Sequence, residues 1–220
     1  MEQVAVFGGT FDPVHWGHLV IAQTALSQLN LERVIWVPAR HPPHKQGLTY
    51  KHRRFMVERA IADNPAFVLS PVEISHSGKD YAVETLAYLQ DVYPNRQWYW
   101  IVGIDTFQTL PRWYCREKLI PACDWLVAPR SVPVLAIAVR STKTNPSQEG
   151  TDMQASLLCQ QVAGQLALQN ISIRWHLLQM PGVSLSSTLI RQHCRHGHSI
   201  RYLVPEAVRA YITNHKLYSD

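Results

Sequence analysis

The sequence predicts an α/β fold in which a doubly wound parallel sheet is followed by C-terminal helices. Short runs rich in Val, Ile, Trp and Phe alternate along the chain with segments whose apolar residues recur every three or four positions. Strands that alternate with helices form βαβ units, and such units make parallel sheets with right-handed crossovers. We therefore expect one parallel sheet with helices on its faces.

The expected elements follow from where each pattern begins and ends. Apolar runs bounded by Gly, Pro or polar residues predict strands at 3–7, 33–37, 67–74, 98–102, 125–128 and 171–178. Helical spacing predicts helices at about 17–29, 51–62, 81–92, 153–168, 187–193 and 205–214. The segment 39–50, which contains adjacent prolines, and the polar segment 140–151 are expected to be loops.

Composition limits the class of protein. The 220 residues are 46% hydrophobic and 17% charged, which is too apolar for a disordered chain and fits a single domain over 1–220 with an insertion around 131–170. The N-terminal residues lack a signal-peptide pattern, and no apolar run approaches the roughly 18 residues that span a bilayer. The four cysteines form no CxxC pair, so we expect reduced thiols in a cytoplasmic protein without membrane association.

The net charge of +5 predicts an anionic partner, which could be a nucleic acid, a membrane surface or a phosphorylated small molecule. The charge is uneven along the chain. Residues 1–60 carry seven basic and four acidic residues, and residues 186–220 carry five and two, so each segment has a net charge of +3. Nine of the eleven histidines lie in the same two segments. Basic character is therefore concentrated at the two ends of the chain.

The most informative motif, GGTFDPVHWGH (8–18), directly follows the first expected strand. Gly8 and Gly9 let the backbone come close to a ligand, and a helix that begins near Gly17 points its free N–H groups at an anion. His15 and His18 are three residues apart, so both can face one ligand from the first helical turn. Neither GxGxxG nor GK[ST] occurs here, which argues against a dinucleotide-binding oxidoreductase and a Walker-type ATPase.

Two further segments contain residues that can bind phosphate. Ser187 and Thr188 belong to a hydroxyl-rich turn that enters a helix, with Arg191 one turn later. The sequence PPHK (42–45) places Lys45 in the loop after the second strand. Each signal is weak alone, because Ser and Thr cap many helices and loop lysines are usually solvated. The loops of a doubly wound sheet converge at the carboxyl ends of its strands, however, so we expect these groups to share one site.

Simpler interpretations of the histidines exist. His15 and His18 could cap a helix, or form a metal pair, but zinc needs third and fourth ligands. Only the segment CRHGH (194–198) could supply them, and a solvated helix end explains that segment more simply. We expect no metal ligand from protein side chains.

Several motifs together resemble a known family. GGTFDPVHWGH resembles the GGxFDPxHxGH signature of nucleotidyltransferases, and SLSSTLIR (184–191) resembles their ISSTxIR motif. The finer similarity is to bacterial nicotinate mononucleotide adenylyltransferases. It extends through VPARHPPHK, DYAVETL, WIVGIDTF, LPRWY and LVPEAVRAYITNHKLY, and it covers nearly the whole chain except about 131–170. The resemblance implies a Rossmann-like sheet of the nucleotidyltransferase type.

The resemblance also implies a reaction, the transfer of an adenylyl group from ATP to nicotinate mononucleotide in NAD biosynthesis. The mononucleotide phosphate would attack the α-phosphorus of ATP and release pyrophosphate, so positioning and charge stabilisation would carry the catalysis. Mg²⁺ would accompany ATP, held largely by phosphate and water. The matching catalytic residues are His15, His18, Lys45 and Arg191, and the matching ATP-binding residues are Gly8, Gly9, Thr10, Phe11, His15, His18, Ser187, Thr188 and Arg191.

For the mononucleotide, the resemblance implies contacts from Asp12, Lys45, Thr85, Asp105, Trp113 and Tyr114. Trp113 would stack on the pyridine ring, with a core aromatic as the alternative, and Asp105 would contact ribose or phosphate or cap the following helix. Ala82 and Ile104 depart from the family pattern near this expected site. The preference for the acid over the amide is therefore left open.

Three alternatives remain at this point. The chain could prefer nicotinamide mononucleotide, or it could be a phosphopantetheine adenylyltransferase, although those enzymes are shorter and lack the PPHK and RWY features. A nucleic-acid-binding module is suggested only by the charge, and it would need a basic stripe with interleaved aromatics. We expect ATP and a pyridine mononucleotide as partners, and no nucleic acid. A homo-oligomer is compatible with the size, but nothing in the sequence decides it.

Overall fold

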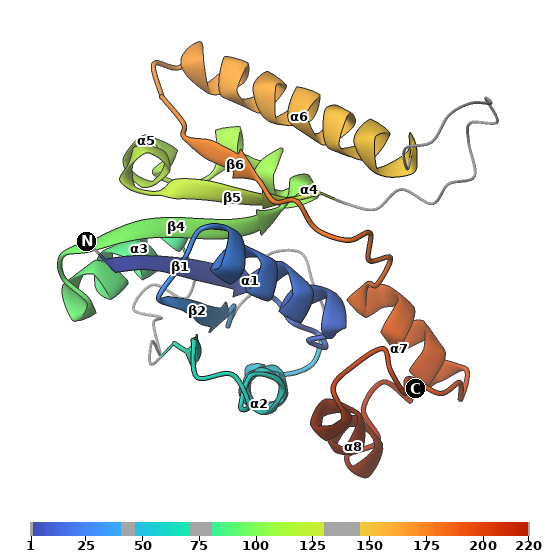
Figure 1. The fold of residues 1–220 in the computed structure, drawn as a ribbon. Helices are drawn as coiled ribbons and strands as arrows, with labels where there is room; N and C mark the ends of the chain where they lie inside the picture. The colour runs from blue at the N-terminus through green and yellow to red at the C-terminus, as the bar shows by residue number, and fades with distance from the viewer. Residues whose placement is uncertain (1, 41–46, 71–80, 130–145, 220) are drawn as a thin grey trace.

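The computed structural model describes residues 2–40, 47–70, 81–129 and 146–219. Its sheet is six-stranded and parallel, in the order β3-β2-β1-β4-β5-β6 (Figure 1). The strands are β1 (Glu2–Gly9), β2 (Arg33–Pro38), β3 (Phe67–Leu69), β4 (Arg96–Gly103), β5 (Asp124–Ala128) and β6 (Trp175–Leu177). The chain progresses from β1 toward one edge and then crosses to build the other half, which is the doubly wound arrangement that the sequence predicts.

Helices connect these strands. The longer helices are α1 (Trp16–Gln28), α2 (Tyr50–Ala60), α3 (Ala82–Val92), α6 (Pro146–Ala167), α7 (Ser187–Arg195) and α8 (Glu206–Asn214). Between β4 and β5 lie the short helices α4 (Ile104–Phe107) and α5 (Arg116–Leu119), with 3₁₀ turns at Leu110–Arg112 and Ile120–Ala122. The sequence did not predict these short elements, because three or four residues are too few to establish a helical period.

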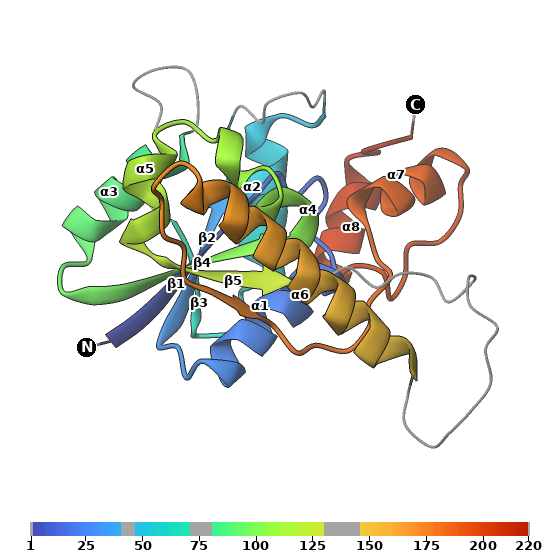
Figure 2. The ribbon, with the colours of Figure 1, turned by 90° about the horizontal axis from the view of Figure 1, so that it is seen from above.

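The core has two halves, one on each face of the sheet (Figure 2). Side chains of successive strand residues point to opposite faces, so Ala5 and Phe7 of β1 pack with α1, α2, α7 and α8, whereas Val4 and Val6 pack with α3, α4, α5 and α6. A central strand that is buried on both faces must be continuously apolar. This explains why QVAVF reads as an uninterrupted hydrophobic run.

Three element boundaries differ from the sequence prediction. The prediction of a loop at 140–151 is wrong from residue 146 onward, because α6 begins at Pro146. Proline is well tolerated in the first helical turn, and an established helix extends at little free-energy cost. Residues 140–145 lie outside the described part of the chain. The strand expected at 171–178 is only Trp175–Leu177, and of the strand expected at 67–74 the structure describes Phe67–Leu69. Both are edge strands, which are commonly short.

The C-terminal helices lie beyond the carboxyl ends of the strands (Figure 1). α8 packs against α2, where the rings of Phe55 and Tyr211 stack at 4.3 Å and the Tyr211 hydroxyl lies 3.0 Å from Nδ1 of His52. Ile190 of α7 and Val208 of α8 are buried in the same half of the core as α1. The end of the chain is therefore docked beside the segment that follows β1.

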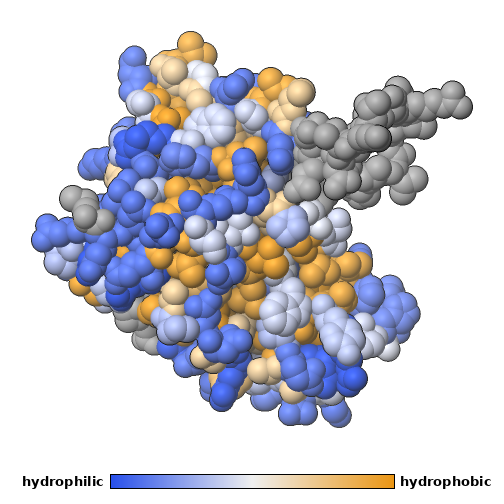
Figure 3. Space-filling model, in the orientation of Figure 1, coloured by the Kyte–Doolittle hydropathy of each residue, from blue (hydrophilic) through white to orange (hydrophobic). Residues whose placement is uncertain are grey.

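The surface carries large hydrophobic side chains at scattered positions, including Trp16, Tyr88, Met153 and Tyr202. Figure 3 shows one face, on which hydrophobic and hydrophilic residues are mixed. Such scattered exposure is normal for a folded protein. No helix within the described ranges is long and apolar enough to cross a membrane.

Candidate active site

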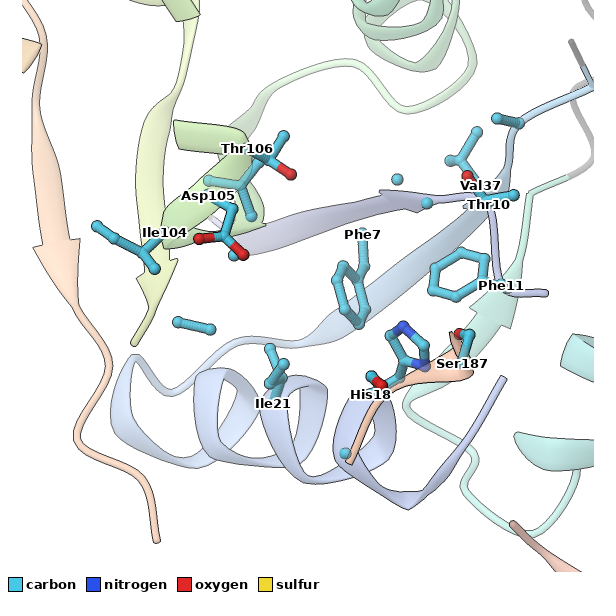
Figure 4. Close-up of a pocket in the computed structure, with 18 of the residues that line it drawn as sticks. Phe7, Thr10, Phe11, His18, Ile21, Val37, Ile104, Asp105, Thr106 and Ser187 are labelled. Atoms are coloured by element: carbon cyan, nitrogen blue, oxygen red, sulfur yellow. The ribbon is translucent and has the colours of Figure 1, made fainter. Parts of the chain in front are cut away.

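A pocket of about 880 Å³ lies at the carboxyl ends of the central strands. The residues after β1, the α4 region after β4 and the beginning of α7 contribute to its walls (Figure 4). The sequence-predicted residues that line it are Gly8, Gly9, Thr10, Phe11, Asp12, His15, His18, Thr85, Asp105, Trp113, Tyr114, Ser187, Thr188 and Arg191. Lys45 lies outside the described residues. Motifs that are far apart in the sequence thus line one pocket, as the convergence of strand ends predicts.

The turn between β1 and α1 is compact because Gly9 has no side chain. A Cβ atom on Gly9 would lie 2.9 Å from the ring of Phe11, which is far too close. Phe11 itself has a left-handed backbone with a φ of 50°, and its ring is 2% exposed and packs edge-on against Phe7 and His18. Phe11 therefore packs against His18 in addition to lining the pocket.

The two histidines of the motif form a close pair at the beginning of α1. His15 is the N-cap of the helix, and its backbone N–H donates to Nδ1 of His18 at 3.2 Å, with the ring centroids 3.8 Å apart. Since Nδ1 of His18 accepts this hydrogen bond, a neutral His18 carries its proton on Nε2. His18 is thus set up to present an Nε2–H donor.

Burial determines the charge of His15. Its side chain is 5% exposed, and desolvation lowers the pKa of His15 from 6.5 to about 4 because a charged imidazolium is costly away from water. The Nδ1 atom of His15 is buried without a hydrogen-bond partner. Its ring lies close over Gly17, where a Cβ atom would be 3.0 Å away. His15 is therefore a neutral histidine at physiological pH, and Gly17 makes room for it.

A buried arginine that the sequence analysis did not select holds the same turn. Arg53 of α2 is 2% exposed, and its guanidinium donates to the carbonyl oxygens of Thr10 at 2.7 Å, Arg40 at 3.2 Å and Leu48 at 3.0 Å. One side chain thus joins the turn after β1, the end of β2 and the approach to α2. The sequence does contain a signal for Arg53. It is spaced three and four residues from Met56 and Val57, and this spacing puts its charge on the core face of the helix.

The helix α7 is attached directly to the turn after β1. The Oγ of Ser187 donates to the carbonyl of Pro13 at 2.9 Å, and Nη1 of Arg191 donates to the carbonyl of Asp12 at 2.7 Å. Nη2 of Arg191 lies 3.3 Å from Oγ1 of Thr188. The N-terminus of a helix leaves backbone N–H groups without intrahelical partners and has a positive dipole end. The first turn of α7 therefore gathers hydroxyls, N–H groups and a guanidinium at the pocket.

The opposite wall is formed by the α4 region. Figure 4 shows Asp105 and Thr106 across the pocket from His18 and Ser187. Asp105 is an exposed residue in the first turn of α4. Thr85 of α3 is 9% exposed, and its hydroxyl donates to the carbonyl of Tyr81 at 3.3 Å. A carboxylate thus faces the cationic wall across the pocket.

Two aromatic residues border this opposite wall. Trp113 is half-buried, packs at 80° to Trp125 with centroids 5.9 Å apart, and donates from Nε1 to Oγ1 of Thr109 at 2.9 Å. Tyr114 is 56% exposed and lies against Tyr81 at 4.2 Å. Trp113 contacts the core and also lines the pocket, and its stacking on a pyridine ring stays a prediction.

The apolar part of the lining was not predicted from the sequence. These residues come from strand ends, from α1, from the beginning of α4 and from the irregular segment before α7, where hydrophobic periodicity carries no information about a pocket. They are Phe7, Ile21, Val37, Trp100, Val102, Ile104, Met180, Val183 and Leu185.

Among the residues that the structure describes, no group of three or more His, Cys, Asp or Glu side chains could hold a metal ion. His196 and His198 lie exposed at the end of α7, in the manner of a solvated helix end. The four cysteines are free thiols.

The fold and the pocket define a class of protein. A glycine turn after the first strand, a histidine pair and a helix N-terminus with Arg191 line one pocket of an α/β sheet. This set of donors suits an anion, as in a nucleotidyltransferase. In agreement, a family model described as cytidylyltransferase-like matches residues 6–193.

Proteins of similar sequence and structure indicate which kind of nucleotidyltransferase this is. Proteins of Trichormus variabilis and a Nostoc species, each named "probable nicotinate-nucleotide adenylyltransferase", are 53% and 54% identical over 220 residues, which cover 100% of this chain and 99% of each relative. A Plasmodium falciparum nicotinic acid mononucleotide adenylyltransferase complexed with NaAD shares the fold, with a TM-score of 0.72, 19% identity, and coverage of 99% of this chain and 98% of that one. The chain belongs to the cytidylyltransferase-like family and, within it, to the nicotinate-nucleotide adenylyltransferases.

Proposed function

We propose that the protein transfers the adenylyl group of ATP to nicotinate mononucleotide, giving deamido-NAD and pyrophosphate. The observation that carries the proposal is the two-walled pocket, with His18 and the N-terminus of α7 on one wall and Asp105 and Trp113 on the other. Such an arrangement can hold two nucleotides with their phosphates facing each other. The names of the full-length relatives support this pair of substrates.

The wall that carries His18 and α7 would bind the phosphates of ATP. The Nε2–H of His18, the guanidinium of Arg191 and the first-turn N–H groups of α7 are all donors, and Gly8 and Gly9 line the pocket beside them. His15 is neutral, so it contributes a shaped, uncharged surface and orients His18 through its backbone N–H. Lys45 keeps its proposed role as a further cation at the phosphates.

The reaction needs no covalent enzyme intermediate. An oxygen of the mononucleotide phosphate forms a bond to the α-phosphorus of ATP, the bond from that phosphorus to the oxygen bridging the β-phosphate breaks, and the bonding electrons leave with pyrophosphate. Negative charge grows on the leaving oxygen and on the phosphoryl oxygens. Preorganised donors at His18 and Arg191 stabilise this charge more in the transition state than in the ground state.

The wall that carries Asp105 would bind the acceptor. The indole of Trp113 would stack on the pyridine ring, since its other edge is fixed against Trp125 and its Nε1–H is already bonded. Asp105 would accept hydrogen bonds from ribose hydroxyls. We propose smaller contributions from Thr85 and Tyr114, which also line this part of the pocket.

Mg²⁺ would enter with ATP. Because the pocket offers no protein cage for a cation among its described residues, phosphate oxygens and water would be the ligands of the ion. Bound in this way, Mg²⁺ supplies screening of the triphosphate charge. We place the reaction in the cytoplasm, where both substrates would be available.

The proposal is tested by measuring pyrophosphate release from ATP and Mg²⁺ with nicotinate mononucleotide, nicotinamide mononucleotide or phosphopantetheine as separate acceptors. A reaction without acceptor is the control for ATP hydrolysis. We expect nicotinate mononucleotide to give the highest kcat/KM. Faster turnover of the amide would support the alternative that the protein makes NAD directly, and no turnover with either pyridine mononucleotide would refute the proposal.

A further inference from the structure

Tyr218, close to the end of the chain, reaches the turn after β1. Its hydroxyl donates to Oδ1 of Asp12 at 2.6 Å, although 206 residues separate the two. The Tyr218 ring is half-buried and packs against the core half that contains α1 and α2. Burial and the bond to Asp12 raise the pKa of Tyr218, so the phenol stays protonated and remains a donor at physiological pH.

Asp12 is constrained on several sides. It is 6% exposed, and its carbonyl oxygen accepts a hydrogen bond from Nη1 of Arg191 at 2.7 Å. Its second carboxylate oxygen lies against Gly47, where a Cβ atom would be only 2.2 Å from Oδ2. Arg191 thus contacts the main chain of Asp12, while the carboxylate is turned toward Tyr218.

This arrangement matters because the preferred partner of a carboxylate is a guanidinium. An Asp–Arg pair is a strong, charge-assisted and often bidentate interaction. If Asp12 formed that pair, it would occupy the donors of Arg191 and place a negative charge where phosphate has to bind. The Tyr218 hydroxyl offers the carboxylate a neutral partner instead.

We infer that Tyr218 is a positioning residue that binds the Asp12 carboxylate and thereby keeps the Arg191 guanidinium available for the phosphates of ATP. The inference rests on the proposed phosphate-binding role of Arg191. It also changes the role expected for Asp12, whose carboxylate acts within the protein through Tyr218 rather than on the mononucleotide.

The test compares two Tyr→Phe variants in the C-terminal segment. Tyr218→Phe keeps the ring and removes the bond to Asp12. Tyr211→Phe is the matched control, because it removes a hydroxyl that lies 3.0 Å from Nδ1 of His52 in the α2–α8 contact. ATP affinity is measured by calorimetry, kcat and KM by pyrophosphate release, and folding by thermal unfolding.

We expect Tyr218→Phe to weaken ATP binding and raise KM for ATP by about tenfold, the size of one lost charge-assisted hydrogen bond, while kcat changes less than about twofold. Tyr211→Phe should leave ATP affinity unchanged, even where it lowers Tm equally. Equal ATP affinity in Tyr218→Phe and wild type, or the same loss in Tyr211→Phe, would overturn the inference.

Testing Tyr218→Phe in an Asp12→Asn protein separates the effect of the Asp12 charge from the effect of Tyr218 packing. In Asp12→Asn, residue 12 cannot form an ion pair with Arg191, so adding Tyr218→Phe should change ATP affinity by less than about twofold. An equal tenfold loss in both backgrounds would overturn the inference. Because ATP binding needs no acceptor, a wild-type protein that binds ATP without turnover would refute the proposed function, while the affinities still decide the role of Tyr218. A wild-type protein that does not bind ATP would refute both.

Discussion

His15 and His18 are three residues apart in the motif, yet their surroundings give them different properties. His15 is buried under the beginning of α1 and neutral, whereas His18 is half-buried and directs a protonated Nε2 away from the His15 backbone. In the sequence the two histidines look equivalent. Solvent access makes one a packing and orienting group and leaves the other at the pocket, where we propose that it donates to the reacting phosphates.

The burial of His15 predicts that the protein loses stability in mild acid. In the unfolded chain the pKa of His15 is near 6.5, and burial lowers it to about 4 in the folded protein, so the unfolded state binds the extra proton. The stabilisation is complete above pH 6.5 and is lost as the pH falls toward 4, by about 2 kcal/mol between pH 8 and pH 5. Urea unfolding of wild type and His15→Asn at pH 8, 6.5 and 5 measures how the free energy of unfolding of each protein changes with pH. Identical pH profiles for the two proteins would contradict the prediction.

The donor role that we propose for His18 predicts a loss of catalysis without a loss of folding. His18→Ala should lower kcat by about a hundredfold or more, because one preorganised donor to the transition state is removed. His196→Ala, at the exposed end of α7, is the control and should keep full activity. Pyrophosphate release gives the rates, and circular dichroism confirms the fold. An active His18→Ala enzyme would show that the transition state does not depend on this side chain.

At the scale of secondary-structure elements, glycines have opposite effects in the turn after β1 and in α6. A Cβ atom on Gly9 would lie 2.9 Å from the ring of Phe11. Gly164 is exposed in a helix, and a Cβ atom there would have no other atom within 4 Å. The first position excludes a side chain for steric reasons. The second only adds backbone freedom to the unfolded chain.

The same substitution should therefore change stability in opposite directions. Gly9→Ala should lower the free energy of unfolding by about 1–3 kcal/mol, since the buried Phe11 ring has no space to move. It should also reduce activity, because Phe11 packs against His18. Gly164→Ala should raise the free energy of unfolding by about 0.5–1 kcal/mol without changing activity. Urea denaturation measures both, and a stable, fully active Gly9→Ala protein would contradict this account of the turn.

The longer elements could be predicted because their signals are local. Helices α1, α2, α3, α7 and α8 begin within about a residue of their predicted positions, as their spacing of apolar residues requires. The beginning of α6 was missed because its first turns are polar and carry no periodic signal. The lengths of β3 and β6 depend on pairing with a single neighbour, which no local pattern encodes.

At the scale of the whole molecule, the two basic segments of the chain meet at the pocket. Residues 1–60 contribute the histidine pair and residues 186–220 contribute Arg191, which donates to the Asp12 carbonyl. Part of the net charge of +5 therefore lies at the pocket, contributed by both ends of the chain. The proposed polyphosphate substrate would account for this concentration of basic residues.

A site assembled from both ends of the chain predicts strong stabilisation by its ligand. ATP at a concentration a hundredfold above its Kd should stabilise the folded state by about 2.7 kcal/mol, which for a chain of this size corresponds to a rise in Tm of about 5–10 °C. Differential scanning fluorimetry measures the shift. Arg191→Ala should lose most of it, whereas Arg195→Ala, one turn further along α7 and exposed, should keep it. An equal shift in both variants would show that α7 does not bind ATP through Arg191.

The sequence by itself determined the doubly wound class, the longer elements and many of the polar residues that line the pocket. It could do so because periodic apolar patterns and short motifs are properties of neighbouring residues, and because strand ends converge in such a sheet. Only the tertiary structure decided that Arg53 and Tyr218 hold the turn after β1, that His15 is neutral and that apolar side chains complete the pocket. Those features depend on contacts between residues 43 and 206 positions apart and on the exclusion of water, which exist only once the chain has folded.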